Sequence, residues 1–366
     1  MSSSYILSDE QQMLRDSVRR WVQPQDVRAS TPFDTIWKHM ADMGWLAAGL
    51  PEESGGLGGS AMDYAIIAEE LGRGLARVPY VEAVTMTAQV LLSVAPDRLP
   101  ALVAGEVLTV IAHDEPDSRG DPEWTGCRAV RRDAGWSLTG IKSAVLGAPE
   151  AQAIICTAQV DGAGLTFFEV EEAGVTLDAY KTIDDRSSAD VRLRDALARP
   201  LGALGSALPI VKRALDYALV VESAEAVGAM TRAFELASDY LTTRRQFGQR
   251  IADFQALRHL LADMFIELEQ ARSMMMRGAA ALDAAEIPVR EAQAAATKAF
   301  VAKAGLYVTG QSIQLHGGIG MTLEYPVGHF FNRLVAFNQR HGTADAHITR
   351  FAGLHQRHPS DSASST

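Results

Sequence analysis

A chain of 366 residues is long enough to form two or three domains with sizeable hydrophobic cores. Its formal net charge is -11 at pH 7 and its pI is about 5.3. This balance argues against binding to nucleic acid or to anionic membranes, because both need a basic surface. Cys127 and Cys156 are the only cysteines. They are too few for a disulfide framework, and neither has the spacing of a metal ligand.

The start of the chain, Met1–Ser4, has neither the basic nor the apolar character of a secretory signal. The most apolar long segment is interrupted by Asp216, Glu222 and Glu225, so it is unsuited to crossing a membrane. We therefore expect a cytoplasmic protein that has no membrane partner.

Residues 8 to 105 show helical periodicity. Ser8 can cap a first helix, whose buried side is marked by Leu14, Val18, Trp21 and Val22. Further helical segments are predicted at residues 36–43 and 62–71. The glycine-rich loop between them, 55–59, follows no strand and contains no G-x-G-x-x-G. It is predicted to be a turn rather than a dinucleotide-binding loop.

Near residue 107 the period changes to that of strands separated by Gly, Pro and Asp. The β-rich runs are 108–112, 136–139, 153–157, 165–170, 175–177 and 191–193. Short strands without intervening helices predict a small antiparallel barrel or sandwich.

From about residue 206 to 351 the helical period returns, in four or five long segments typical of a bundle. One helix is expected to stop at a left-handed Gly248, and Asp253 can cap the next. The apolar positions of that next helix are Leu257, Leu260, Leu261, Met264, Phe265 and Leu268. The short connection requires the two helices to be antiparallel.

The predicted fold class is α+β and mostly α. The predicted domains are an N-terminal helical domain (1–105), a middle β domain (106–205) and a C-terminal helical bundle (206–356), followed by a disordered tail (357–366).

The connection after the first long bundle helix carries the sequence RRQFG at residues 244–248. It places two guanidinium groups and an aromatic ring at one end of the bundle, an arrangement suited to a planar or phosphorylated ligand. The plain alternative is a solvated turn with ordinary surface arginines. Taken alone, this motif does not separate the two interpretations.

Further stretches complete a pattern: PEESGGLG at 51–58, QLHGGIG at 314–320, EYP at 324–326 and NR at 332–333. Together with RRQFG, and in this order along almost the whole chain, they resemble the acyl-CoA dehydrogenase family. In that family a carboxylate removes the α-proton of an acyl-CoA thioester while the β-hydride goes to N5 of FAD. The resemblance implies FAD as cofactor and an acyl-CoA as substrate.

The catalytic base of the family is missing from both of its known positions. His341, followed by Gly-Thr, stands where most members have a glutamate. Some relatives carry the base on an earlier helix, where this chain has Ala218, with Leu219 in place of the usual arginine. Glu222 and Glu225 fall on other faces of that helix. They are interpreted as polar or interface residues, and no catalytic residue is assigned.

The middle domain also departs from the family pattern. The segment 114–121 reads DEPDSRGD, where the family has Thr-Glu-Pro-x-x-Gly-Ser-Asp. The segment 142–147 reads KSAVLG, with Ala144 in place of the Trp that walls the flavin and Leu146 in place of a Thr that hydrogen-bonds near N5. The resemblance therefore implies that the chain's own flavin face is degraded.

Other family residues are retained. In the family, the Arg-x-x-Phe-Gly turn and the Gln-x-x-Gly-Gly segment reach across the dimer interface to the pyrophosphate and adenosine end of the neighbouring subunit's FAD. The matching residues here are Arg244, Gln246, Phe247, Gln314, Gly317 and Gly318. An arginine can bond a pyrophosphate, and glycines let backbone N–H groups approach a ligand closely.

The leading hypothesis is the non-catalytic subunit of a heteromeric acyl-CoA dehydrogenase, such as the α2β2 enzymes that act on steroid side-chain thioesters. A related subunit with the catalytic Glu is then its partner, and FAD is shared across the interface. The alternative is a self-sufficient flavoenzyme with His341 or Asp345 as an atypical base. A non-enzymatic scaffold is a third interpretation. No metal site is predicted, and His113 and His316 are interpreted as structural.

Overall fold

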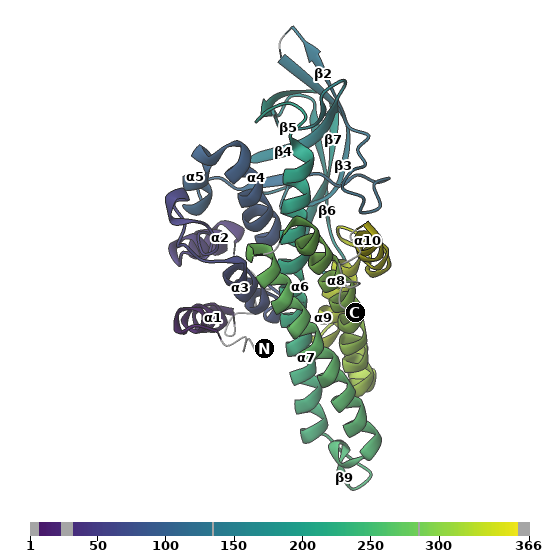
Figure 1. The fold of residues 1–366 in the computed structure, drawn as a ribbon. Coiled ribbons are helices and arrows are strands. Elements are labelled where there is room, and N and C mark those ends of the chain that lie inside the picture. Colours follow the sequence, from purple (N-terminus) through teal and green to yellow (C-terminus); the bar gives the residue numbers. More distant parts are fainter. Residues whose placement is uncertain (1–6, 23–31, 134, 285, 358–366) are drawn as a thin grey trace, which may run out of the picture. The chain divides into compact units, whose positions relative to one another are not determined.

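The computed structural model describes residues 7–22, 32–133, 135–284 and 286–357. Helices come first, strands follow, and helices close the chain (Figure 1), which confirms the predicted fold class. The chain divides into two compact units. One comprises Met1–Val27, Ala65–Ala76 and Leu219–Thr366, and the other comprises Arg28–Tyr64 and Arg77–Ala218. The predicted domain limits at residues 105, 205 and 356 stay a prediction, and the predicted tail lies outside the described residues apart from Arg357.

The N-terminal part is helical, as predicted. Its helices are α1 (Asp9–Val22), α2 (Phe33–Asp42), η1 (Glu52–Ser54), α3 (Ala61–Arg73), the π-helix η2 (Val81–Met86), α4 (Thr87–Val94), η3 (Pro96–Arg98) and α5 (Leu99–Val103). Ser8 caps α1 as expected. The Gln11 N–H donates to Ser8 Oγ at 3.2 Å, and the Ser8 N–H donates to Gln11 Oε1 at 3.3 Å. This reciprocal pair satisfies two backbone donors at the helix start.

The middle part forms a closed barrel. Its strands are β1 (Thr109–Ala112), β2 (Arg128–Arg132), β3 (Gly135–Leu146), β4 (Ala153–Val160), β5 (Gly164–Val170), β6 (Val175–Lys181) and β7 (Ser187–Leu201). Following the pairings β4-β2-β3-β7-β5 returns to β4, while β1 adds to β4 and β6 adds to β7. Of the two predicted architectures, the barrel is therefore the one formed.

Two features of the barrel differ from the prediction. The sheet was expected to be antiparallel, but β1 and β2 both run parallel to β4. Strand β2 was not predicted at all. It contains three arginines, and Ala129 is its only buried residue, so it lacks the alternation of apolar and polar residues that marks a half-buried strand.

A buried ion pair lies inside the β region. Lys142 Nζ donates to Glu115 Oε1 at 2.6 Å and to Thr157 Oγ1 at 3.1 Å. Burial alone would raise the pKa of Glu115, but Lys142 and further hydrogen bonds hold that pKa below its usual value. His113 Nδ1 lies 2.9 Å from Thr157 Oγ1, in agreement with its predicted structural role.

The C-terminal part contains five helices among the described residues, as predicted: α6 (Ala207–Thr243), α7 (Gln255–Ala284), α8 (Ile287–His316), α9 (Val327–Gln339) and α10 (Ala344–Arg357). The 3-10 turn η5 (Gly317–Met321) joins α8 to α9. The Phe234 and Phe265 rings of α6 and α7 lie 5.9 Å apart, and Gly278 of α7 packs against Val220 of α6. The sequence order of these contacts shows that α6 and α7 are antiparallel, as expected.

The connection between α6 and α7 is more elaborate than the predicted turn. Helix α6 ends at Thr243, before Gly248, and a small hairpin of β8 (Arg245–Gln246) and β9 (Gln249–Arg250) follows. Gly248 is left-handed as expected, with φ of 79°. The predicted capping role of Asp253 is wrong, because α7 begins at Gln255 and Asp253 ends the 3-10 turn η4 (Ile251–Asp253). Its Oδ1 lies 3.4 Å from Nη2 of Arg250.

Candidate cofactor-binding site

The α6–α7 hairpin holds Phe247 outward at a conformational cost. Its loop consists of Phe247 and Gly248, whose φ angles are 53° and 79°. Positive φ at both central residues is what a two-residue type I′ loop requires. Glycine adopts it freely, whereas a phenylalanine there costs on the order of 1 kcal/mol. The Phe247 side chain is 89% exposed and touches only the edge of Phe254 among the rings of the described residues.

The two faces of the hairpin carry different residues. The Ile251 N–H donates to the Arg244 carbonyl at 3.0 Å, and Gln246 pairs with Gln249 beside the loop. Because side chains alternate along a strand, Arg244 and Gln246 share one face. The guanidinium of Arg244 is exposed and forms no ion pair with the described residues. It is therefore available to an anionic ligand.

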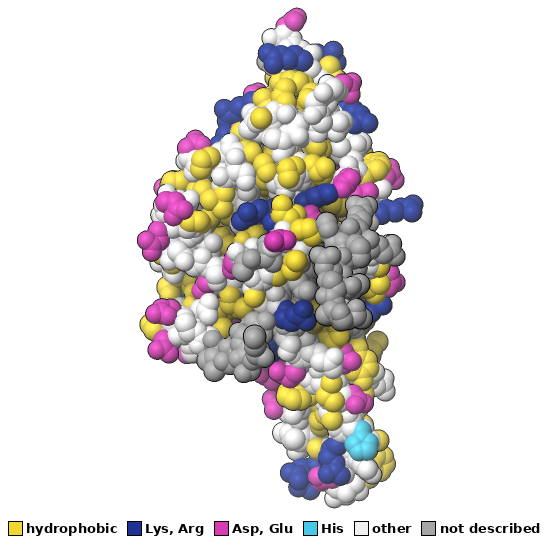
Figure 2. Space-filling view, in the orientation of Figure 1, with side chains coloured by type: hydrophobic (Ala, Val, Ile, Leu, Met, Phe, Trp, Pro, Cys, Tyr) yellow, Lys and Arg dark blue, Asp and Glu magenta, His cyan; other side chains and the backbone are white. Residues whose placement is uncertain are grey.

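The opposite face carries Arg245 directly across from Arg250. Like charges directly opposite each other weaken a strand pair, and the exposed Asp253 balances only one of them. Figure 2 shows Lys and Arg side chains gathered at this end of α6 and α7. The hairpin is thus a locally basic structure on a chain of acidic net charge.

The second predicted segment lies at the C-terminal end of α8. Gln314 is exposed in the last turn, and the Gly317 N–H donates to its carbonyl to end the helix. Gly317 has φ of 64° and ψ of -139°, a combination that residues with a Cβ avoid. No heavy atom lies within 4 Å of a Cβ built at Gly317 or Gly318. The backbone is therefore open to close approach by a ligand.

The buried His316 packs between the end of α6, which leads into the hairpin, and the segment that follows α8. The His316 ring lies 4.6 Å from the ring of Tyr240 on α6 and 4.7 Å from that of Tyr325. Nδ1 lies 2.6 Å from the Ser312 carbonyl, so it carries the proton, and Nε2 accepts from the Tyr325 hydroxyl at 3.1 Å. Burial lowers the pKa of His316. The ring is a structural group, as predicted.

The two tyrosines of this stack were not singled out in the sequence. Tyr240 lies one helical turn before Arg244, a spacing that places it beside the hairpin. Tyr325 belongs to the EYP stretch, which was noted only as part of the family pattern. Their role in joining α6 to the end of α8 depends on contacts between distant parts of the chain, which helical periodicity does not reveal.

The α9–α10 loop, where the resemblance places the catalytic segment, is held by internal hydrogen bonds. His341 lies in this α9–α10 loop with φ of 53°. Its carbonyl accepts from His347 Nε2 at 2.8 Å, and its own Nε2 lies 3.4 Å from Nη2 of Arg340, which donates to it. Asp345 points to solvent, 86% exposed, with Oδ1 3.2 Å from Lys303 Nζ.

Buried ion pairs explain the two glutamates of α6. Glu222 pairs with Arg340 through Oε1, and its Oε2 lies 3.7 Å from Lys298 Nζ. Glu225 pairs with Arg333 of α9. Both carboxylates are engaged in holding α6 to the C-terminal helices, in agreement with their interpretation as polar helix residues. The expectation that they lie on other faces than Ala218 is wrong, because positions four and seven residues apart share one face of a continuous helix. Ala218, at the alternative position of the base, is buried and apolar.

The β region presents Ala144 where the family pattern has a tryptophan. A β-bulge interrupts the pairing of β3 with β7 between Lys142 and Val145, and Ala144 is exposed there with φ of 52°. Its N–H donates to Asp190 Oδ1 at 3.0 Å, so this backbone donor is already used. At this bulge the chain thus offers a methyl group and an already bonded carboxylate rather than an indole ring.

No group of three or more metal-ligating side chains occurs in the described part of the chain. Among those same residues, no helix combines the length and apolar character that a membrane span requires.

Comparison with known proteins identifies the class. The C-terminal domain of acyl-CoA dehydrogenases matches residues 208–352, and the N-terminal domain of the same family matches residues 8–98. The chain belongs to the acyl-CoA dehydrogenase family, whose members are FAD-dependent oxidoreductases acting on CH–CH bonds.

Individual relatives cover nearly the whole chain. The probable acyl-CoA dehydrogenase YngJ of Bacillus subtilis is 29% identical over 88% of this chain and 92% of its own. The structure of the Tcur3481-Tcur3483 steroid ACAD G363A variant is similar with a TM-score of 0.87, at 27% identity over 96% of this chain and 99% of the other. The ChsE4-ChsE5 complex of Mycobacterium tuberculosis shares the fold, with a TM-score of 0.85, 24% identity and coverage of 99% and 100%.

Proposed function

We propose that this chain is the non-catalytic subunit of a heteromeric acyl-CoA dehydrogenase and that it completes the FAD site of a related partner subunit. The observation that carries the proposal is a contrast between two sites. The His341 loop is held by internal hydrogen bonds, whereas Arg244, near the exposed Phe247, is itself exposed and makes no ion pair with the described residues. The partner supplies the catalytic glutamate and the flavin-ring face. This chain supplies groups that reach the FAD from across the interface.

The retained residues fit the polar half of a dinucleotide. Arg244 offers charge-assisted bonds to a pyrophosphate, and Gln246 and Gln314 offer amide groups. Gly317 and Gly318 leave their backbone accessible. The His316 stack holds the two segments in fixed relation. When FAD is bound there it supplies hydride acceptance, whereas these residues only hold and orient it.

Apolar side chains that stay exposed among the described residues support the interface. Phe265 and Ile266 of α7 are about half exposed, and Phe247 almost fully. Exposed apolar side chains on a hairpin and on its neighbouring helix are typical of a contact with another protein. The similarity to the Tcur3481-Tcur3483 steroid enzyme supports a two-component assembly and a bulky acyl-CoA, such as a steroid side-chain thioester, as the substrate class. A cytoplasmic location stays a prediction.

The test is the flavin content, measured by visible absorbance, of the chain purified alone and co-expressed with a related chain from its own gene neighbourhood. We expect the lone chain to be nearly colourless and the pair to hold about one FAD per two chains. A yellow, active assembly of this chain alone would overturn the proposal.

Three variants sharpen this test. Arg244→Gln in the pair should weaken FAD retention about tenfold or more, because it removes a charged hydrogen-bond donor. Arg245→Gln, on the other face of the hairpin, is the matched control. His341→Ala should leave the turnover of the pair unchanged, whereas a self-sufficient enzyme with a histidine base would lose most of its activity.

A further inference from the structure

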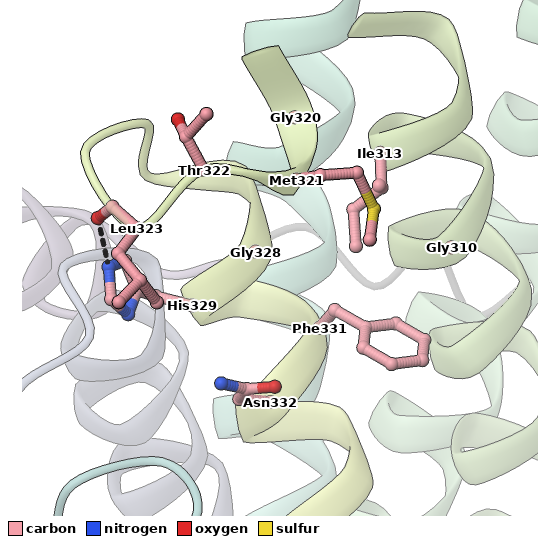
Figure 3. A pocket seen from close by; sticks show the side chains of 10 residues that line it. All are labelled: Gly310, Ile313, Gly320, Met321, Thr322, Leu323, Gly328, His329, Phe331 and Asn332. Atoms are coloured by element: carbon pink, nitrogen blue, oxygen red, sulfur yellow. Dashed lines mark hydrogen bonds between the residues drawn. The ribbon is translucent and has the colours of Figure 1, made fainter. Parts of the chain in front are cut away.

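A pocket of about 420 Å³ lies between the end of α8, the η5 turn and the start of α9. Figure 3 shows Ile313, Met321 and Phe331 around it. Its lining includes part of the same 3-10 turn as Gly317 and Gly318. The pocket therefore belongs to the glycine segment described above.

Strand β6 of the barrel is a separate feature, and it has a partner on one side only among the described residues. It pairs with β7 in a regular antiparallel register along its whole length. The Gly174 carbonyl, just before the strand, accepts from the Arg194 N–H of β7 at 2.9 Å. Because bonding alternates along an antiparallel strand, Leu177, Ala179 and Lys181 point their backbone N–H and C=O groups away from β7. These groups make no hydrogen bond to a described residue, so the strand has an open edge.

Two of the usual protections of an edge strand are absent from β6. Its pairing with β7 has no β-bulge, the strand contains no proline, and six of its seven residues are exposed. The side chains of Leu177 and Ala179 continue the face of the sheet formed by buried Val191 and Ala189 of β7. Leu177 itself is 37% exposed. An open, regular and partly apolar edge is a ready site for the addition of a further strand.

The charges along this edge are complementary to those of a second copy. Glu171 and Glu172 precede the strand and Lys181 ends it. All three side chains are exposed, and none forms an ion pair with a described residue. In an antiparallel pair of two β6 strands, the acidic start of one lies beside the basic end of the other. A parallel pair would instead bring like charges together.

The side chains also determine the register of such a pair. With Asp178 on the two-fold axis, two carboxylates would face each other, which is unfavourable. With Leu177 on the axis, Val175, Leu177 and Ala179 of both copies form one apolar row. On the other face Asp178 then lies opposite Thr176 of the second copy, whose hydroxyl can donate to it. An axis one pair further along would place the terminal lysine of β6 opposite a leucine and interrupt the row.

We propose that β6 is a docking surface for a second copy of this chain, and that two β6 strands pair antiparallel about a two-fold axis at Leu177. The Leu177 N–H of each copy donates to the Leu177 carbonyl of the other, and the Ala179 N–H donates to the Val175 carbonyl. The two β regions then share one continuous sheet across the axis. This pairing goes beyond the proposed function and does not depend on it, because it needs neither FAD nor a related subunit.

The first experiment measures self-association of the lone chain by sedimentation at increasing concentration. Two short strands bury little area, so we expect a Kd on the order of 10 µM. Leu177→Lys places two ammonium groups together on the axis and should weaken the association at least about tenfold. Leu204→Lys is the matched control, because Leu204 is a leucine of similar exposure, 44%, that follows β7. A wild-type chain that stays monomeric, or equal effects of the two variants, would overturn the proposal.

The second experiment tests the register by cysteine cross-linking under mild oxidation. The Cα atoms of a hydrogen-bonded antiparallel pair are about 5.5 Å apart, which a disulfide can span. Leu177→Cys should therefore give a covalent dimer on a non-reducing gel. Ala179→Cys should not, because the two cysteines would be displaced by four residues, about 13 Å along the strands. The native Cys127 and Cys156 are buried. Cross-linking of both variants, of neither, or of the Ala179 variant alone would overturn the proposed pairing.

Two further outcomes separate this inference from the proposed function. If the lone chain does not self-associate and Leu177→Lys weakens only its assembly with the related subunit, the open edge receives a strand of that subunit and the self-pairing fails. If the lone chain dimerises and cross-links through Leu177 but never forms a flavin-sharing pair, the β6 pairing stands and the proposed function fails.

Discussion

Phe247 and His341 have the same unusual backbone φ of 53°, yet their surroundings are opposite. Phe247 projects from a two-residue hairpin loop into solvent. His341 is half-buried. Its carbonyl accepts from His347, and its neighbour Arg340 pairs with buried Glu222. A strained backbone residue that makes few contacts within its own chain is typical of a surface that binds another molecule. A strained residue held by several hydrogen bonds and ion pairs is typical of a rigid loop.

The largest expected effect comes from removing the buried ion pair between Glu222 and Arg340, next to His341. Glu222→Ala leaves Arg340 and Lys298 without their buried counter-charge and should lower the free energy of unfolding by about 3–5 kcal/mol. Urea denaturation measures this loss. Asp263→Ala, at an exposed position of α7, should change stability by less than about 0.5 kcal/mol. A loss below about 1 kcal/mol for Glu222→Ala would show that the loop is not held by this pair.

The next effect concerns pH. Burial lowers the pKa of His347 to about 3, and Lys298 and Arg350 add to the shift. Because the unfolded chain takes up this proton near pH 6.5 and the folded chain does not, stability is complete above pH 6.5 and falls as the pH drops toward 3. Between pH 7 and 5 the wild type should lose about 2 kcal/mol more than His347→Gln. His259→Gln, at an exposed histidine of α7, serves as control, and parallel curves for wild type and His347→Gln would contradict the assignment.

The smallest expected effect is a gain in the free energy of unfolding, and it concerns the hairpin loop at Phe247. Phe247→Asn places a residue that tolerates the left-handed conformation in the hairpin loop. Because Phe247 buries almost nothing within this chain, the lone variant should gain about 1 kcal/mol in thermal or urea unfolding. The same variant should associate less tightly with the partner subunit. A destabilised lone chain would mean that Phe247 packs within its own subunit.

Much of the architecture follows from local sequence pattern. The order of helices and strands, the antiparallel pair α6 and α7, and the capping role of Ser8 all depend on periodicity or on residues close in sequence. The motifs RRQFG and QLHGGIG predicted two exposed segments, and the structure joins them through His316.

Other features depend on distant contacts and could not be predicted. The Glu222–Arg340 pair joins residues far apart in the chain, and neither lies in a recognisable ion-pair motif. The hairpin loop places Phe, rather than Asn or Asp, before Gly, so it lacks the usual turn signal. The three arginines of strand β2 obscure the alternation of apolar and polar residues by which a strand is predicted.

The facing arginines of the hairpin have a consequence for assembly in solution. Arg245 and Arg250 lie opposite each other, so in the isolated chain small anions from the buffer should condense around them. Docking of a subunit that offers its own negative groups would set those ions free, and the entropy of their release would favour association. The complex should then loosen as salt concentration rises, because release into a solution already rich in ions gains less entropy.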